Sequence, residues 1–208
     1  MNAKFISIEG IEGAGKSTQI SFIQQFLEQH GKRVVVTREP GGTELGEQVR
    51  ELLLMPRETG MSHDAELLLM FAARAEHIHQ VIKPALQRGD WVLCDRFVDA
   101  TFAYQGGGRG IPAARIQTVS DWTLNTLQTD LTLLFDLPVN IGQQRVVKRQ
   151  QQKDRFEQEK ADFFQQIRDC YLQRAADEPD RIRTIDASHD IDTIQQQLRD
   201  ILTGLLAS

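Results

Sequence analysis

A glycine-rich segment near the start of the chain sets the strongest limit on its fold. Residues 10–18 read G-I-E-G-A-G-K-S-T, after an apolar run at 5–8 and before an amphipathic stretch. This is the strand, loop and helix order that the G-x-x-x-x-G-K-[ST] phosphate-binding loop requires. The alternative is a strand-to-helix turn that holds no ligand. The residues predicted to bind a nucleotide are Gly10, Ile11, Glu12, Gly13, Ala14, Gly15, Lys16, Ser17 and Thr18.

The chemistry of such a loop explains its residue types. Glycines let main-chain N–H groups turn inward, and the helix that follows adds the positive end of its dipole. Lys16 can reach the β- and γ-phosphates of a nucleoside triphosphate, and the Ser17 hydroxyl can bind Mg²⁺. We therefore expect a nucleotide and Mg²⁺ at this loop.

Short apolar runs recur along the chain with helical stretches between them. The candidate strands are residues 5–8, 33–37, 91–94, 131–135 and 182–185. They lack strict alternation, which is typical of parallel strands covered on both faces. The helical stretches are 17–30, 44–55, 64–88, 112–126, 139–150, 157–176 and 191–206. We predict one α/β domain over residues 1–208, a P-loop NTPase-type three-layer α/β/α fold with a five-stranded parallel sheet.

Composition narrows the classes of partner. The net charge is -5, which does not favour binding to a nucleic acid polymer. Neither a signal peptide nor an apolar segment of membrane-spanning length is recognisable, so we expect a cytoplasmic protein without membrane association. Cys94 and Cys170 lack metal-ligand spacing.

His77 and His79, two residues apart, point to different helix faces, and we expect surface or packing roles for both.

Residues 145–160 differ from the rest of the chain. They are rich in glutamine and basic side chains and contain little that could be buried. One interpretation is a solvated junction between two helices, and the other is a short basic lid that closes over phosphates. The phosphate loop upstream favours the lid.

Charged residues follow two of the predicted strands. In open α/β sheets, ligands bind beyond the carboxyl ends of the strands. Asp95 and Arg96 end the third strand, where the aspartate can hold Mg²⁺ and the arginine a second anion. The alternative is a structural ion pair. After the second strand, Glu39 lies in a turn and is an uncompensated carboxylate only if Arg38 faces away; otherwise the two pair.

Two groups of helical residues could contact a nucleobase. Thr101, Tyr104 and Gln105 have the spacing of one helix face and could bind the edge and sugar of a base. The alternative is a half-buried polar face. Residues 106–110 read as a flexible loop bordering this site. Phe71 and Arg74 could stack on a base and donate to its carbonyl, although most helical phenylalanines belong to a core.

Together these segments resemble the bacterial thymidylate kinase family. The matching stretches are I-E-G-I-E-G-A-G-K-S-T, V-T-R-E-P-G-G-T, L-L-M-F-A-A-R-A, D-R-F-V-D-A-T-F-A-Y-Q-G-G-G-R-G-I and D-R-F-E, in the family's order over about 150 residues. The resemblance implies transfer of the γ-phosphoryl group of ATP to dTMP, giving dTDP and ADP, by a homodimer. Dimer contacts through helices such as 64–88 are expected.

The resemblance also assigns roles to matching positions. Phe71 would stack on thymine, Arg74 would bond to a ring carbonyl, and Thr101 and Gln105 would help to bind the base. Tyr104 would crowd the sugar 2′ position, and Arg96 would hold the acceptor phosphate. The remaining substrate contacts are Glu39, near the sugar hydroxyl and the metal, and Arg50, a weaker candidate for the acceptor phosphate.

The resemblance to one bacterial subtype of the family indicates which residue supplies the catalytic cation. Some relatives carry a basic residue inside the phosphate loop, whereas this loop carries Glu12 and Ala14 and the lid is basic. The chain therefore looks like the subtype whose lid supplies the cation. Arg155, or failing that Arg149, is expected to neutralise the transferring phosphoryl group.

Two other functions fit the phosphate loop. The first is a kinase for a different small acceptor, such as another nucleoside monophosphate, a deoxynucleoside or shikimate. The second is a nucleotide-dependent switch with little turnover. Switch proteins usually lack a second anion-binding group, whereas this chain has Arg74 and Arg96 besides the loop.

Overall fold

A parallel sheet forms the centre of the computed structural model, which describes residues 3–148 and 154–207. Its strands are β1 (Phe5–Glu9), β2 (Val34–Arg38), β3 (Trp91–Asp95), β4 (Leu131–Asp136) and β5 (Ile182–Asp186). Among the described residues they number five, in the order β2-β3-β1-β4-β5. Each neighbouring pair is parallel. The predicted fold class is confirmed.

Helices cover both faces of this sheet. On one side lie α1 (Lys16–Gln29) and α9 (Ile191–Ala207). The other side carries α2 (Glu44–Leu54), α3 (His63–His77), α4 (Lys83–Gln87), α5 (Val98–Thr101), α6 (Ala113–Leu124) and α8 (Ala161–Asp177), while α7 (Val139–Lys148) lies at the carboxyl ends of the strands. In the described part of the chain, no helix combines the length and the apolar sequence needed to cross a membrane.

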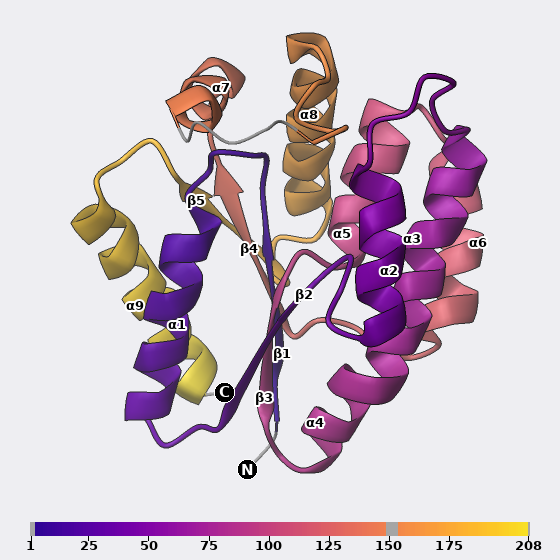
Figure 1. The fold of residues 1–208 in the computed structure, drawn as a ribbon. Helices are drawn as coiled ribbons and strands as arrows, with labels where there is room; N and C mark the ends of the chain where they lie inside the picture. The colour runs from indigo at the N-terminus through magenta and orange to yellow at the C-terminus, as the bar shows by residue number, and fades with distance from the viewer. Residues whose placement is uncertain (1–2, 149–153, 208) are drawn as a thin grey trace.

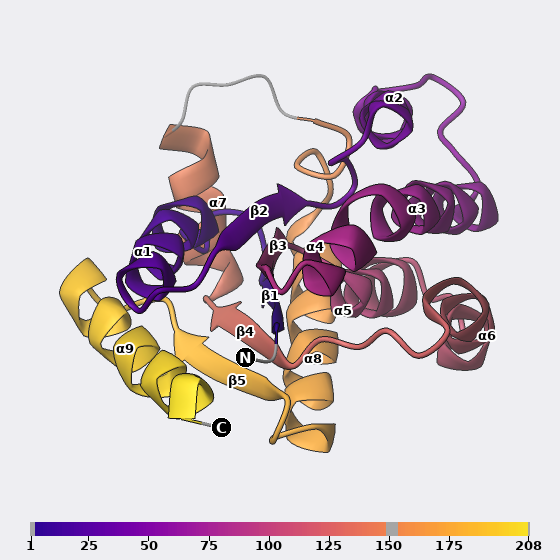
Figure 2. The same ribbon diagram turned by 90° about the horizontal axis from the view of Figure 1, so that it is seen from below.

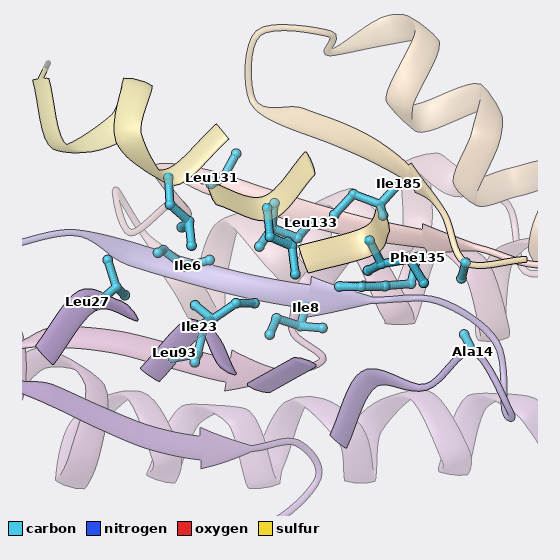
Figure 3. Close-up of a cluster of buried hydrophobic side chains, with 14 of the residues drawn as sticks. Ile6, Ile8, Ala14, Ile23, Leu27, Leu93, Leu131, Leu133, Phe135 and Ile185 are labelled. Carbon is cyan, nitrogen blue, oxygen red and sulfur yellow. The ribbon is translucent and has the colours of Figure 1, made fainter. Parts of the chain in front are cut away.

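The alternating side chains of β1 divide the core between the two faces. Ile6 and Ile8 point toward α1 and α9 and pack with Ile23 and Leu27 of α1 (Figure 3). Phe5 points the other way, into a cluster with residues of α3, α4 and α6. All five side chains are 0–1% exposed, and burying each contributes roughly 1.5–3 kcal/mol to folding. Apolar burial on both faces explains why these runs do not alternate.

The long helix expected over residues 64–88 is divided into three segments. A π-helical segment, η1 (Ile78–Ile82), lies between α3 and α4, just before Pro84. Proline has no N–H and its ring crowds the preceding turn, so the wider π turn accommodates it.

The prediction of a flexible loop over residues 106–110 is wrong for residues 106–108. A second π-helical segment, η2 (Phe102–Gly108), continues from α5 through three glycines. Its packing against α8 explains their composition, since a Cβ on Gly107 would lie 2.8 Å from the main-chain oxygen of Gln166. A Cβ on Gly108 would lie 2.5 Å from the ring of Phe163. The glycines therefore permit a close helix contact.

A buried ionic network ties α5 and α8 to the sheet. The Asp99 carboxylate, 1% exposed, is 2.6 Å from Arg174 Nη2 and 2.7 Å from Arg181 Nη1. Thr132 of β4 also donates to Asp99, over 3.1 Å. Burial raises the pKa of Asp99, but hydrogen bonds from Arg181 and the charge of Arg174 outweigh burial and hold it below its usual value. Asp99 is thus the buried anion shared by two arginines, both of which also pair with the more exposed Glu178.

We predict that Asp99→Asn destabilises the protein by about 3 kcal/mol, because it removes the buried anion shared by two guanidinium groups and leaves them only the partly exposed Glu178. Chemical denaturation measures the loss. Arg115→Gln is the matched control, since it breaks an ion pair with Asp64 whose side chains are 59% and 56% exposed. Equal stability of the two variants would contradict the importance assigned to the buried network.

Candidate active site

The phosphate loop connects β1 to α1 at the carboxyl edge of the sheet (Figure 1). Gly10, Gly13 and Gly15 have φ of 135°, 80° and 83°, which side-chain-bearing residues rarely adopt. A Cβ on Gly10 would collide with the main-chain oxygen of Phe135. The loop therefore needs glycine for its shape and for its fit against β4.

Lys16 begins α1 and folds back over the loop. Its Nζ donates to the carbonyl oxygens of Gly10, at 2.9 Å, and Ile11, at 3.2 Å. Burial lowers the pKa of Lys16 to about 8, and the nearby charge of Arg96 adds to this shift. Phosphate oxygens would be stronger acceptors than these carbonyls. Ser17 and Thr18 are exposed in the first turn of α1.

Arg96 connects the phosphate loop to its neighbours. Its Nη2 donates to Gly10 O over 3.3 Å, to Glu12 Oε1 over 2.8 Å and to Tyr104 Oη over 2.7 Å. Although burial opposes its charge, Tyr104, Glu12 and Asp95 raise the pKa of Arg96 well above its usual value. Its Nε is buried without a hydrogen-bond partner among the described residues. The group is therefore a fixed cation with a free donor.

Glu9 holds the backbone beside Arg96. Arg96 has a left-handed φ of 69°, and the next N–H, of Phe97, donates to Glu9 Oε1 over 2.7 Å. The Tyr171 hydroxyl of α8 donates to Glu9 Oε2, also over 2.7 Å. Burial and then the charge of Asp99 raise the pKa of Glu9 to about 7. The sequence analysis missed this glutamate, which the apolar strand pattern did not distinguish.

A cavity of about 80 Å³ opens next to Arg96. It is bounded by the turn after β2 and by residues of α2, α3, α5 and η2. Of the eight predicted substrate residues, seven line it: Glu39, Arg50, Arg74, Arg96, Thr101, Tyr104 and Gln105. Four segments far apart in the sequence therefore meet here.

Phe71 is not among the residues that line this cavity. It is 3% exposed and packs in the core cluster with Phe97 and Ile78. The Arg74 guanidinium lies over its ring, 4.8 Å from the centroid. Phe71 therefore supports Arg74 here, and its stacking on a base stays a prediction.

A buried chain of polar groups fixes Glu39. Its carboxylate accepts from Arg74 Nε over 2.7 Å and lies 2.9 Å from His77 Nδ1. His77 Nε2 is in turn 2.6 Å from Thr37 Oγ1. Arg38 faces away and pairs with Glu47. Glu39 is thus compensated by residues other than its neighbour. His77 is buried, but its two hydrogen bonds support Glu39, which the expected surface or packing roles did not include.

Asp95 and Ser17 are the residues that could hold Mg²⁺. The Asp95 Oδ1 is buried and has no hydrogen-bond partner among the described residues. That unpaired oxygen fits a cation or its bound water, since Mg²⁺ keeps several waters and is shared with phosphates. Over the described ranges, no group of three or more His, Cys, Asp and Glu side chains forms a metal site.

Part of the predicted lid borders the cavity. Asp154 and Phe156 line it, and Asp154 Oδ1 accepts from the N–H groups of Phe156 and Glu157, both at 2.9 Å. At the other end of the segment, Arg145 Nη1 donates to Gly13 O over 3.3 Å. Arg149 lies outside the described residues.

Arg155 is turned toward α2 and α3. Its Nε donates to Leu53 O over 2.7 Å, and its Nη1 lies 2.7 Å from Glu66. The guanidinium also lies over the Phe156 ring. The hydrogen bonds and ion pairs that it makes with described residues do not involve the phosphate loop. Its contact with a phosphoryl group stays a prediction.

Known proteins are similar to this chain in sequence and in fold. The family described as Thymidylate kinase matches residues 8–198. A thymidylate kinase of Alcanivorax borkumensis is 52% identical, over 100% of this chain and 99% of its own length. One from a Janthinobacterium species is 54% identical over 97% of both chains. A crystal structure of thymidylate kinase from Ehrlichia chaffeensis superposes with a TM-score of 0.78 and 32% identity, covering 97% and 99% of the two chains.

We predict that Glu9→Gln changes how stability depends on pH. Because the pKa of Glu9 is raised from 4.5 to about 7, the folded state holds more protons than the unfolded state between these values. The unfolding free energy of the wild type, relative to the variant, therefore falls by up to about 3 kcal/mol as pH rises through this window.

Urea unfolding at several pH values measures this difference. Glutamine keeps one acceptor for Phe97 N–H, and the Tyr171 hydroxyl can accept from the new amide. Glu58→Gln, at an exposed loop position, is the control and should parallel the wild type. Parallel profiles for Glu9→Gln as well would refute the titration.

Proposed function

Because the chain belongs to the thymidylate kinase family, we propose that its cavity binds dTMP and that its phosphate loop binds the donor nucleotide. The enzyme is a nucleoside monophosphate kinase. It transfers the γ-phosphoryl group of ATP to dTMP, giving dTDP and ADP. The assignment of each step to particular residues is the proposal.

The position of Arg96 carries this proposal. Its guanidinium lines the cavity and also hydrogen-bonds to Gly10 and Glu12 of the phosphate loop. A monophosphate in the cavity would therefore lie next to the triphosphate on the loop. That proximity is what an in-line transfer between two phosphates requires.

We assign nucleoside binding to the cavity walls. Arg74 and Gln105 lie where they would contact the base, Thr101 assists, and Tyr104 would exclude a 2′-hydroxyl. Support comes from burial, since Arg74, Thr101 and Gln105 are 1–2% exposed yet line the cavity. Glu39 and Arg50 would lie near the sugar and acceptor phosphate.

The transfer itself needs charge neutralisation more than covalent chemistry. Lys16 would exchange its loop carbonyls for the β- and γ-phosphates, and Arg96 would hold the acceptor phosphate with its free Nε. Asp95 and Ser17 would hold Mg²⁺, which supplies further charge neutralisation when bound. A general base is not needed, because the acceptor oxygen is already ionised.

We also propose the domain organisation, the cellular location and the oligomeric state of the protein. Residues 1–208 would form one kinase domain with a lid at about 145–160, working in the cytoplasm as a homodimer. The exposed side chains of Leu68 on α3 and Trp122 on α6, 58% and 87% accessible, support dimer contacts through these neighbouring helices. Sedimentation of the wild type and of Trp122→Glu tests the dimer.

An acceptor panel tests the function. The protein is incubated with ATP, Mg²⁺ and, in turn, dTMP, dUMP, dCMP, dGMP, a deoxynucleoside or shikimate, and ADP release is followed. The expected result is release that is fastest with dTMP. Fastest release with another acceptor would point to a different kinase, and ATP binding without acceptor-dependent release would point to a switch.

Lys16→Ala is predicted to abolish turnover, and Arg155→Ala to lower kcat on the order of 10³-fold with a much smaller rise in KM. The second effect requires Arg155 to leave Glu66 and reach the transferring group. Steady-state kinetics with dTMP and ATP separate the two constants. A variant altered only in KM and melting temperature would show that Arg155 acts through its contacts with α2 and α3.

Substitutions of Tyr104 separately test how the site discriminates between deoxyribose and ribose. Tyr104→Ala should relax rejection of the ribonucleotide 5′-phosphate of thymine, because it removes the ring. Tyr104→Phe keeps the ring and should retain the rejection, while its kcat falls because Arg96 and Glu12 lose the hydroxyl at 2.7 and 2.8 Å. Equal ribose acceptance by both variants and the wild type would exclude the steric role.

A further inference from the structure

Glu66 is a buried carboxylate for which the transfer chemistry has no use. It lies on α3, is 0% exposed and is not among the residues that line the cavity. Its Oε1 accepts from Gln105 Nε2 over 2.8 Å. Two cations flank it, Arg109 Nε at 3.3 Å and Arg155 Nη1 at 2.7 Å, and they offset the cost of burying its charge.

The contact between Glu66 and Gln105 fixes which end of the Gln105 amide faces away from Glu66. A side-chain amide has one donating and one accepting end, whereas a carboxylate only accepts. Glu66 therefore binds the NH₂ group of Gln105. The other end, Oε1, accepts no hydrogen bond from a described residue, and Gln105 lines the cavity. What the amide can offer a ligand is an acceptor.

Arg74 supplies the opposite polarity in the same cavity. Its Nε is bound to Glu39 and its Nη2 to the Phe97 carbonyl oxygen. Its Nη1 is buried and has no hydrogen-bond partner in the described part of the chain. The wall thus offers one unused donor, from Arg74, and one unused acceptor, from Gln105.

We propose that Glu66 is a positioning residue that selects 4-oxo pyrimidines over 4-amino pyrimidines by fixing the amide of Gln105. Thymine and uracil present a carbonyl at C4 and an N–H at N3, which match a donor and an acceptor. Cytosine presents an amino group and a bare nitrogen at these places, so both pairs would be mismatched. This inference rests on the proposed placement of the base in the cavity.

Glu66→Gln tests the proposal. The new amide can donate as well as accept, so Gln105 is free to turn over and offer its NH₂ group to the base. The ratio of kcat/KM for dTMP to that for dCMP should fall roughly 10-fold or more, mainly through KM, because base contacts are made in the ground state as well. The dTMP to dUMP ratio should not change.

Arg109→Gln is the matched control. It removes a cation that faces Glu66 but leaves the carboxylate to orient Gln105. Its melting temperature should fall, and its dTMP to dCMP ratio should stay within about 2-fold of the wild type. Glu66→Asp, still an acceptor only, should keep more of the ratio than Glu66→Gln. If Glu66→Gln does not fold, the double variant Glu66→Gln/Arg109→Gln, which removes one charge of each sign, is measured instead.

The outcomes separate the two claims. A wild type that fails to phosphorylate dTMP contradicts the function before any variant is compared. A wild type that prefers dTMP, together with a folded Glu66→Gln variant of unchanged dTMP to dCMP ratio, overturns the role of Glu66. An equal loss of the ratio in Arg109→Gln also overturns it, because the effect would then follow from loosened packing.

Discussion

Repulsion between two polyanions is the constraint around which the carboxyl edge of this sheet is built. A cation must stand between the donor and acceptor phosphates, and a buried cation needs anions of its own. We propose that Arg96 meets both needs, since Glu12 and Asp95 compensate it while its Nε has no hydrogen-bond partner among the residues that the structure describes. Its left-handed backbone is in turn held by Glu9 through the next N–H. The loop and the cavity are therefore joined through one side chain.

Local patterns in the sequence were sufficient for the fold. Apolar runs of four or five residues without alternation, separated by helical stretches, predicted the parallel sheet, and the glycine-rich loop located its carboxyl edge. Sequence patterns were less reliable where packing overrides composition. Gly106, Gly107 and Gly108 suggested a loop, yet they belong to a helical segment. At Gly107 and Gly108 the glycines are explained by α8, which approaches too closely for side chains.

The residues that support the site could not be found in the same way. Glu9 is bound by Tyr171, 162 positions away, and Glu66 by Gln105, 39 positions away. Pairings over such separations leave no local signature, and a lone acidic residue in an apolar run resembles any other. Arg155 is a second example of a distant pairing that the local sequence does not indicate. Its place in a basic segment predicts a phosphate contact, which stays a prediction, but gives no sign of the ion pair with a glutamate on α3.

The close contact between η2 and α8 limits how the proposed nucleoside pocket could be redesigned. η2 carries Tyr104 and Gln105 on the pocket wall, and its glycines already touch Gln166 and Phe163 of α8. A larger base cannot be accommodated by moving this wall outward, because main-chain atoms stand behind it. Room would have to come from other side chains that border the pocket, such as Leu54 and Met70, which could be shortened.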